Sequence, residues 1–107
     1  MIAPWEPDES LARHGSEVGA EFMWAALDCA GAFAFTAEEG RARPMLLGRL
    51  TGRTMGAVQV GERCTVAGWR IGRDGRKSIA GTAVWNEVGD LRAVARAVWF
   101  DAPEADA

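Results

Sequence analysis

The chain has 107 residues, of which 12 are Lys or Arg and 15 are Asp or Glu, for a formal net charge of -3. With 49% hydrophobic and 25% charged residues, it has the composition of a globular domain, which excludes collagen-like chains. A chain of this length buries about two thirds of the surface that its unfolded form exposes. We therefore expect one domain over residues 1–107, with a core that needs neither a disulfide bond nor a structural metal ion.

Targeting, redox and metal signals are absent from the sequence. No apolar run reaches the roughly 18 residues of a membrane helix, and the first residues lack the profile of a signal peptide. We expect a cytoplasmic protein without membrane contact. Two cysteines, Cys29 and Cys64, argue against a disulfide framework. His14 is the single histidine, and no Cys-x-x-Cys or His-x-x-x-His spacing occurs, so the sequence predicts no metal site.

Charge is distributed unevenly along the chain. Residues 1–43 carry 8 acidic and 3 basic side chains, whereas residues 44–100 carry 9 basic and 4 acidic ones. Arginines in the second half could contact phosphate, but arginines on the outer face of an antiparallel sheet are ordinary, and we favour that interpretation. The negative net charge and the lack of a basic cluster at helical spacing argue against a nucleic-acid partner.

The first third of the chain predicts one extended segment followed by one helix. Prolines punctuate residues 1–15, which predicts an extended segment with at most a short edge strand. Ser16 is a suitable N-cap, so we expect a helix over Glu17–Ala30, with Gly31 as its end signal. From Phe22 to Phe35 the sequence is FMWAALDCAGAFAF, which is apolar around the whole helix and predicts that protein surrounds it.

The rest of the chain alternates with the two-residue period of strands. Asp74-Gly75 lies between two such runs and predicts a tight hairpin with positive φ at both central residues. We expect an exposed connection over residues 36–44 and a frayed tail over residues 101–107. The expected strands are Met45–Met55, Glu62–Ile71, Lys77–Asn86 and Leu91–Phe100.

One buried helix and about four to five antiparallel strands must share a core. The economical solution is an α+β fold in which a curved sheet wraps around the central helix. So short a sheet leaves part of an apolar helix uncovered, which predicts that a second subunit covers the rest. Five glycines in the strand regions would permit curvature and close backbone approach: Gly48, Gly52, Gly68, Gly72 and Gly81.

Five motifs follow one another over roughly residues 4–100: WAALDCAGAFAF, LGRLTGR, VAGWRIGRDGRK, GTAVW and ARAVWF. Their order is similar to that of the hotdog-fold thioesterase superfamily. This resemblance implies a hotdog fold, homodimers in which two sheets join edge to edge, and acyl-coenzyme A ligands that enter between subunits. No cofactor is implied beyond the coenzyme A of the substrate itself.

Asp28 is the candidate catalytic residue, because it is the one carboxylate in the run from Phe22 to Phe35. Burying an ionised carboxylate lowers the stability of the fold unless a cation or hydrogen-bond donors pair with it, so an unpaired one indicates a functional role. It could activate water or attack a thioester, or it could instead pair with Arg49 or Arg53 or accept N–H groups after the helix. Asp28 matches the helix carboxylate of hotdog thioesterases, whereas Gly19, Ala20 and Glu21 replace their His-Gly-Gly turn.

Four further residues are candidates for substrate binding. Trp24 lies one turn before Asp28 and could form a wall of an acyl pocket, although core packing is an alternative. Arg73, Arg76 and Lys77 flank a hairpin tip and could meet the phosphates of coenzyme A, or simply be solvated. Two hypotheses for function follow: an acyl-coenzyme A thioesterase that uses Asp28, and a non-catalytic module of the same fold that binds an acyl or aromatic ligand or a protein partner.

Overall fold

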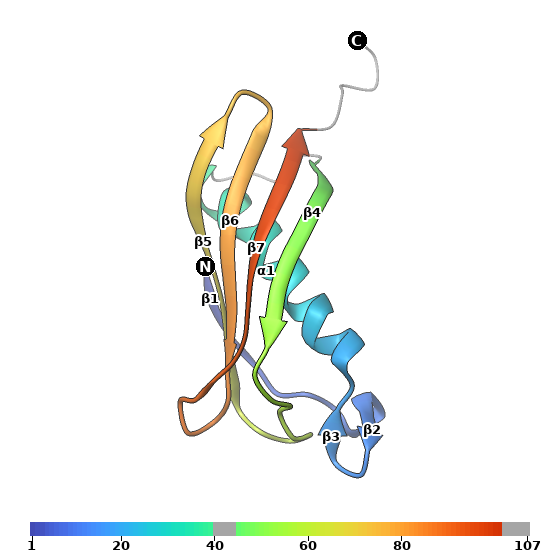
Figure 1. Ribbon diagram of the computed structural model, residues 1–107. Helices are drawn as coiled ribbons and strands as arrows, with labels where there is room; N and C mark the ends of the chain where they lie inside the picture. The colour runs from blue at the N-terminus through green and yellow to red at the C-terminus, as the bar shows by residue number, and fades with distance from the viewer. Residues whose placement is uncertain (40–44, 102–107) are drawn as a thin grey trace.

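A computed structural model, which describes residues 1–39 and 45–101, places one long helix across one face of a five-stranded antiparallel sheet (Figure 1). The strand order is β1-β5-β6-β7-β4, and the sheet is curved but not closed into a barrel. The predicted α+β hotdog architecture is confirmed. Its elements are β1 (Ile2–Trp5), a 3-10 turn η1 (Glu9–Leu11), β2 (Ala12–His14), β3 (Glu17–Val18), α1 (Ala20–Glu39), β4 (Met45–Thr54), β5 (Cys64–Asp74), β6 (Lys77–Trp85) and β7 (Leu91–Asp101).

The four long strands lie where the alternating pattern predicted them, within three residues at each end. β5, β6 and β7 pair in sequence order as an antiparallel meander, also as predicted. The β5–β6 turn differs in detail. Asp74 pairs with Lys77, so the central residues are Gly75 and Arg76, and Gly75 alone has a positive φ, of 61°. A positive φ at the first central residue alone is typical of a type II′ turn, which favours glycine at that position.

The N-terminal segment is more structured than predicted. β1 forms an edge strand beside β5, which confirms the expected short strand. The following residues are not simply extended. They form the 3-10 turn η1 and then a small two-stranded ribbon of β2 and β3, with its turn at Gly15. The predicted frayed tail, residues 101–107, begins at Asp101, the last residue of β7, and its other residues lie outside the described part of the chain.

The helix begins and ends later than predicted. Ser16 lies in the β2–β3 turn and does not cap the helix, because its hydroxyl donates to the side chain of Gln59, in the segment between β4 and β5. The N–H of Val18 donates to the carbonyl of Val58 at 2.9 Å, so the backbone is still extended there and α1 begins at Ala20. Gly31 does not end the helix, because α1 continues to Glu39, through the first four residues of the predicted 36–44 connection, and the rest of that connection lies outside the described residues. A Cβ at position 31 would lie 2.9 Å from Nε1 of Trp99, so this glycine serves close packing.

One stripe of α1 packs against the concave face of the sheet. Met23, Leu27 and Ala30 are at most 2% exposed and contact small or branched side chains of the strands. Other parts of the helix surface are open, since Ala25 and Cys29 are exposed. Within the single chain the sheet therefore covers only one side of the helix, as the shortness of the sheet predicted, and cover of the other side by a second subunit stays a prediction.

Burial separates the two cysteines and predicts their reactivity. Burial, with added repulsion from Glu62 and Glu87, raises the pKa of the Cys64 thiol to about 11, whereas Cys29 is exposed. We expect folded protein at pH 8 to be alkylated by iodoacetamide at Cys29 alone, and unfolded protein to be alkylated at both, as mass spectrometry of digests would show. Equal labelling of Cys64 in the folded state would contradict this burial.

The buried thiol of Cys64 also links stability to pH. Because the ordinary thiol pKa is 9.0, the stability linked to this group is lost as the pH rises from 9 to about 11.

Candidate active site

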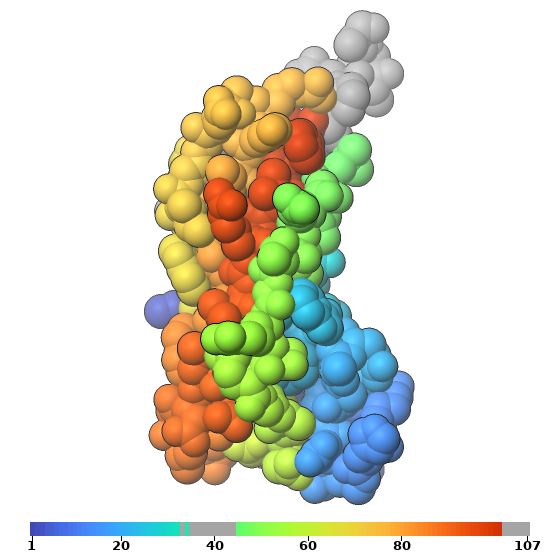
Figure 2. All heavy atoms as spheres, viewed as in Figure 1, coloured from blue at the N-terminus to red at the C-terminus, as the bar shows by residue number. Residues whose placement is uncertain are grey.

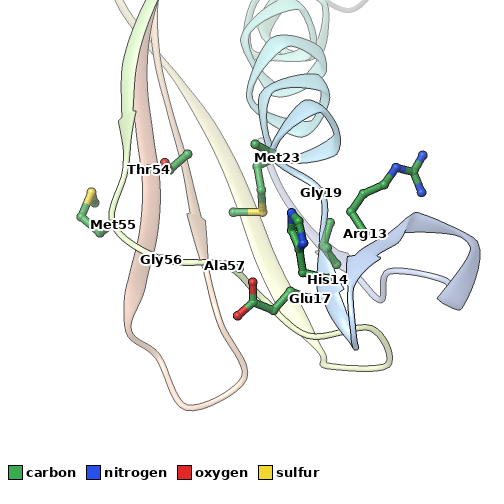
Figure 3. A pocket seen from close by; sticks show the side chains of 11 residues that line it. Arg13, His14, Glu17, Gly19, Met23, Thr54, Met55, Gly56 and Ala57 are labelled. Carbon is green, nitrogen blue, oxygen red and sulfur yellow. The ribbon is translucent and has the colours of Figure 1, made fainter.

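A pocket of about 450 Å³ opens where α1 begins (Figure 3). One wall is the β2–β3 ribbon, the opposite wall is the end of β4 with the segment after it, and Met23 of α1 lies between them. We call it the helix-start pocket. It is lined by Arg13, His14, Glu17, Val18, Gly19, Ala20, Met23, Thr54, Met55, Gly56 and Ala57.

The ribbon brings two titratable side chains into this pocket. His14 and Glu17 are directly opposed across the β2–β3 pair, so their side chains lie on the same face. Gly15, with a φ of 60°, allows the tight turn between them. Figure 3 shows the imidazole of His14 next to the side chain of Met23, with the carboxylate of Glu17 below it and near Ala57. Both residues are exposed, so water reaches them.

The first turn of α1 contributes backbone donors at the same place. The N–H of Gly19 donates to the carbonyl of Leu11 at 3.0 Å, and that of Phe22 donates to the carbonyl of Gly19 at 3.0 Å. The N–H groups of Ala20 and Glu21 have no acceptor among the residues that the structure describes. Unpaired N–H groups at the positive end of a long helix attract an oxygen that carries negative charge.

Asp28 lies further along the helix and outside this pocket. It is half-buried, and within residues 1–39 and 45–101 it makes no hydrogen bond or ion pair. Arg49 and Arg53 are exposed on β4 and do not pair with it, and the other alternative, N–H groups after the helix, falls on residues 40–44, outside the described part of the chain. The carboxylate is therefore available for chemistry.

Trp24 accompanies Asp28 on the helix. It is half-buried, packs against the core cluster that includes Leu27, and does not line the helix-start pocket. At about 100° per residue, positions 24 and 28 fall on the flank of α1 opposite to Phe22 and Cys29. Phe22 and Cys29 face β1, so Trp24 and Asp28 lie on the flank toward β4, at the other edge of the sheet.

The predicted phosphate-binding residues lie at the opposite end of the sheet from the helix-start pocket (Figure 1). Arg73 pairs with Asp101 and donates to the hydroxyl of Ser78 at 2.9 Å. Arg76 donates to the main-chain carbonyl of Asp101 at 2.8 Å, and Lys77 lies 5.8 Å from the centre of the Phe100 ring. Within one chain they cannot share a ligand group with Asp28 or His14.

A second pocket, of about 320 Å³, lies between α1 and β1. Apolar side chains dominate its lining, with Trp5 and Phe22 as its aromatic members. We call it the apolar pocket. The remaining lining residues are Met1, Leu11, Ala25, Ala26, Cys29, Ala30 and Val66.

Two kinds of site are not found in the described part of the chain. No group of three or more His, Cys, Asp or Glu residues there is placed to hold a metal ion. Of the helices in residues 1–39 and 45–101, none is long and apolar enough to cross a membrane.

The sequence interpretation did not single out His14 or Glu17 as site residues, and it placed His14 in an expected extended segment. One signal could have indicated them. His14-Gly15-Ser16-Glu17 has a glycine and a serine between two polar residues, which is a composition typical of a two-residue hairpin. Such a hairpin places its flanking residues opposite one another, although the second wall of the pocket comes from a distant segment.

No protein-family model and no curated protein matches the sequence. Solved structures do match the fold. A Thermus thermophilus hypothetical protein, described as a thioesterase superfamily member, has a TM-score of 0.81 at 19% identity over 98% of this chain and 82% of its own. Zebra fish thioesterase superfamily member 2 has a TM-score of 0.83 at 16% identity, over 94% and 73%. A Streptococcus mutans protein bound to acetyl-CoA has a TM-score of 0.81 at 10% identity, over 96% and 81%. The chain therefore has the hotdog fold that these thioesterase superfamily structures share.

Proposed function

We propose that the chain is an acyl-coenzyme A thioesterase that acts as a homodimer, with Asp28 as base or nucleophile. The observation that carries the proposal is the helix-start pocket, which is lined by Ala20, a residue whose N–H group has no acceptor among the described residues. Such donors stabilise the oxyanion that forms when a thioester carbonyl is attacked. The bound acetyl-CoA of the Streptococcus mutans structure and an Agrobacterium tumefaciens acyl-CoA hydrolase of the same fold support this substrate class.

Helix geometry requires two copies of the chain for this chemistry. Ala20 and Asp28 are eight residues apart, which is about 12 Å along a helix axis. One thioester carbon cannot be within bonding reach of both groups in the same chain. A site that uses both must therefore combine the helix start of one copy with Asp28 of another.

The β4 edge suits such an arrangement. β4 is a ten-residue edge strand, exposed along most of its length, and Figure 2 shows it on the surface beside α1. Leu46 is 60% exposed and Leu47 is 38% exposed. Unpaired strand edges of this length readily accept another strand. Antiparallel pairing of two β4 strands about a two-fold axis would bring the Asp28 flank of each helix toward the other copy.

The same arrangement would give Arg73, Arg76 and Lys77 a role. Antiparallel pairing places the β5–β6 hairpin end of one sheet beside the helix-start end of the other. The three basic side chains would then lie on the side from which a long coenzyme A ligand reaches the helix-start pocket, and Trp24 would border its acyl group. Arginine and lysine bind phosphate groups through charge-assisted hydrogen bonds.

The experiment that tests the function is thiol release from a panel of acyl-coenzyme A thioesters of increasing acyl length, followed with a thiol-reactive dye. We expect turnover of at least one member, proportional to protein concentration. Failure to cleave every member at micromolar protein would overturn the thioesterase proposal.

The binding-module hypothesis has one observation in its favour, the apolar pocket. Its size and lining match sites for small apolar ligands. Trp5 lies in that lining, so an acyl or aromatic ligand bound there would change tryptophan emission. Saturable quenching by acyl-coenzyme A in wild type, lost in Trp5→Phe and without thiol release, would favour this hypothesis over the enzyme.

Charge on the β4 edge should separate the copies. We expect the double variant Leu46→Lys, Leu47→Lys to be monomeric by light scattering at concentrations where wild type is dimeric, because like charges then face each other across the edge. Arg96→Lys, an exposed substitution that retains the charge, is the control and should stay dimeric. A double variant that remains dimeric would place the interface elsewhere.

A further inference from the structure

The helix-start pocket contains a proton acceptor of its own. His14 is the single imidazole of the chain, and it lines the same cavity as the first turn of α1. Figure 3 shows it beside Glu17 and close to Met23. Asp28 of the same chain lies about 12 Å further along the helix. His14 is thus the nearer side chain to a carbonyl held by the helix start.

We propose that His14 is the general base that activates water in this pocket; the inference rests on the proposed thioesterase function and adds a second catalytic residue to it. Asp28 of a second copy attacks the acyl carbon, the carbonyl oxygen becomes an oxyanion beside the N–H group of Ala20, and the carbon–sulfur bond breaks to release the coenzyme A thiolate and leave the acyl group on Asp28. The imidazole of His14 then takes a proton from water while the water oxygen bonds to the acyl carbon. Asp28 leaves as the carboxylate, and the imidazolium gives the proton to the coenzyme A thiolate. The products are a carboxylic acid and a thiol, so atoms and charge balance.

The charged groups around His14 favour this role. Glu17 opposes it on β3 and would stabilise the imidazolium that forms during water attack. Arg13 also lines the pocket, but its guanidinium pairs with Glu21 at 3.1 Å and lies 4.8 Å from the centre of the Phe22 ring. The wall after β4 contributes no titratable side chain, because its lining residues are Thr54, Met55, Gly56 and Ala57.

Two variants and a pH profile separate His14 from Asp28. An imidazole base loses activity as the pH falls through about 7 to 6, whereas a carboxylate base loses it only below about pH 5. We expect His14→Gln to lower kcat/KM about 100-fold and to remove the acidic limb of the pH profile. Glu17→Gln should retain that limb with a smaller loss. Asp90→Asn, in the exposed β6–β7 turn, is the control and should match wild type.

Nuclear magnetic resonance can test directly whether ligand binds next to the His14 imidazole, which a purely structural role of His14 does not require. With one histidine, the chain has one imidazole Hε1 signal. A non-hydrolysable acyl-coenzyme A thioether should shift this signal and its titration in wild type, and also in Asp28→Asn. An unmoved signal at saturating ligand would overturn the proposal even if His14→Gln were slow.

The outcomes also separate this inference from the proposed function. If wild type cleaves thioesters and His14→Gln matches it at every pH, His14 is not the base and the thioesterase function stands. If wild type cleaves nothing in the panel, the function fails and the base role fails with it. Loss of the limb in His14→Gln together with a ligand-dependent Hε1 shift supports both.

Discussion

Replacing Asp28 by Asn is expected to lower thioester hydrolysis by about 100-fold or more, because the site then lacks its nucleophile. The amide has nearly the same shape as the carboxylate but neither takes a proton nor attacks a carbonyl. Because Asp28 makes no hydrogen bond or ion pair with any described residue, the substitution breaks no contact within the chain. Thiol release from the best acyl-coenzyme A substrate measures the effect.

Folding and assembly must be separated from chemistry in this experiment. The melting temperature and the light-scattering mass of Asp28→Asn should match those of wild type. Asp90→Asn is the matched control, since it makes the same chemical change at an exposed turn. Equal rates for Asp28→Asn and wild type would remove Asp28 from the mechanism and leave His14 as the base.

Replacing Gly68 by Ala is expected to destabilise the fold more than any other glycine-to-alanine change in the sheet interior. A Cβ there would lie 2.1 Å from the carbonyl oxygen of Ala30, and that atom belongs to the helix backbone and cannot rotate away. The helix must move off the sheet, so we expect a loss of about 3 kcal/mol, the upper end of the range for overpacking. For a chain of this size, the melting temperature should fall by about 10–20 °C.

Gly72→Ala is the control in the same strand. A Cβ at Gly72 has nothing within 4 Å, so this substitution should leave stability unchanged or raise it slightly by restricting the unfolded chain. Thermal unfolding followed by circular dichroism distinguishes the two variants. Equal melting temperatures for them would show that the helix does not lie directly over Gly68.

The strands could be predicted from the sequence because their pattern is local. In β7, Ala93, Ala95 and Ala97 are buried while the residues between them are not, and this alternation is visible in the sequence. The β5–β6 hairpin could be predicted because glycine marks its turn. Its register was off by one residue, since pairing of Asp74 with Lys77 depends on the whole ladder and not on the turn residues.

The helix bounds could not be predicted because distant residues decide them. Ser16 has the side chain of an N-cap, but it bonds to Gln59, 43 residues away. Gly31 resembles an end signal, but it is the place where Trp99 approaches the helix. No local pattern distinguishes a capping glycine from a packing glycine.

The candidate site could be predicted only in part, for the same reason. Asp28 could be chosen as a candidate because it is the one acid in an apolar run, and it makes no hydrogen bond or ion pair with the described residues. The pocket that would use it is assembled from the β2–β3 ribbon and from residues after β4, which the sequence does not bring together. His14 could therefore not be recognised as a pocket residue from the sequence, because its neighbours in the pocket are distant along the chain.

The measurement that tests the account most directly is complementation between two inactive variants. Asp28→Asn lacks the carboxylate, and Ala57→Trp fills the helix-start pocket from an exposed position. Refolding them together gives mixed dimers in which one site combines the intact pocket of one copy with the intact Asp28 of the other. We expect about a quarter of wild-type activity to return, as random pairing about a two-fold axis predicts. If the mixture stays as inactive as its components while both variants are folded and dimeric, the pocket and Asp28 do not form one site across two copies.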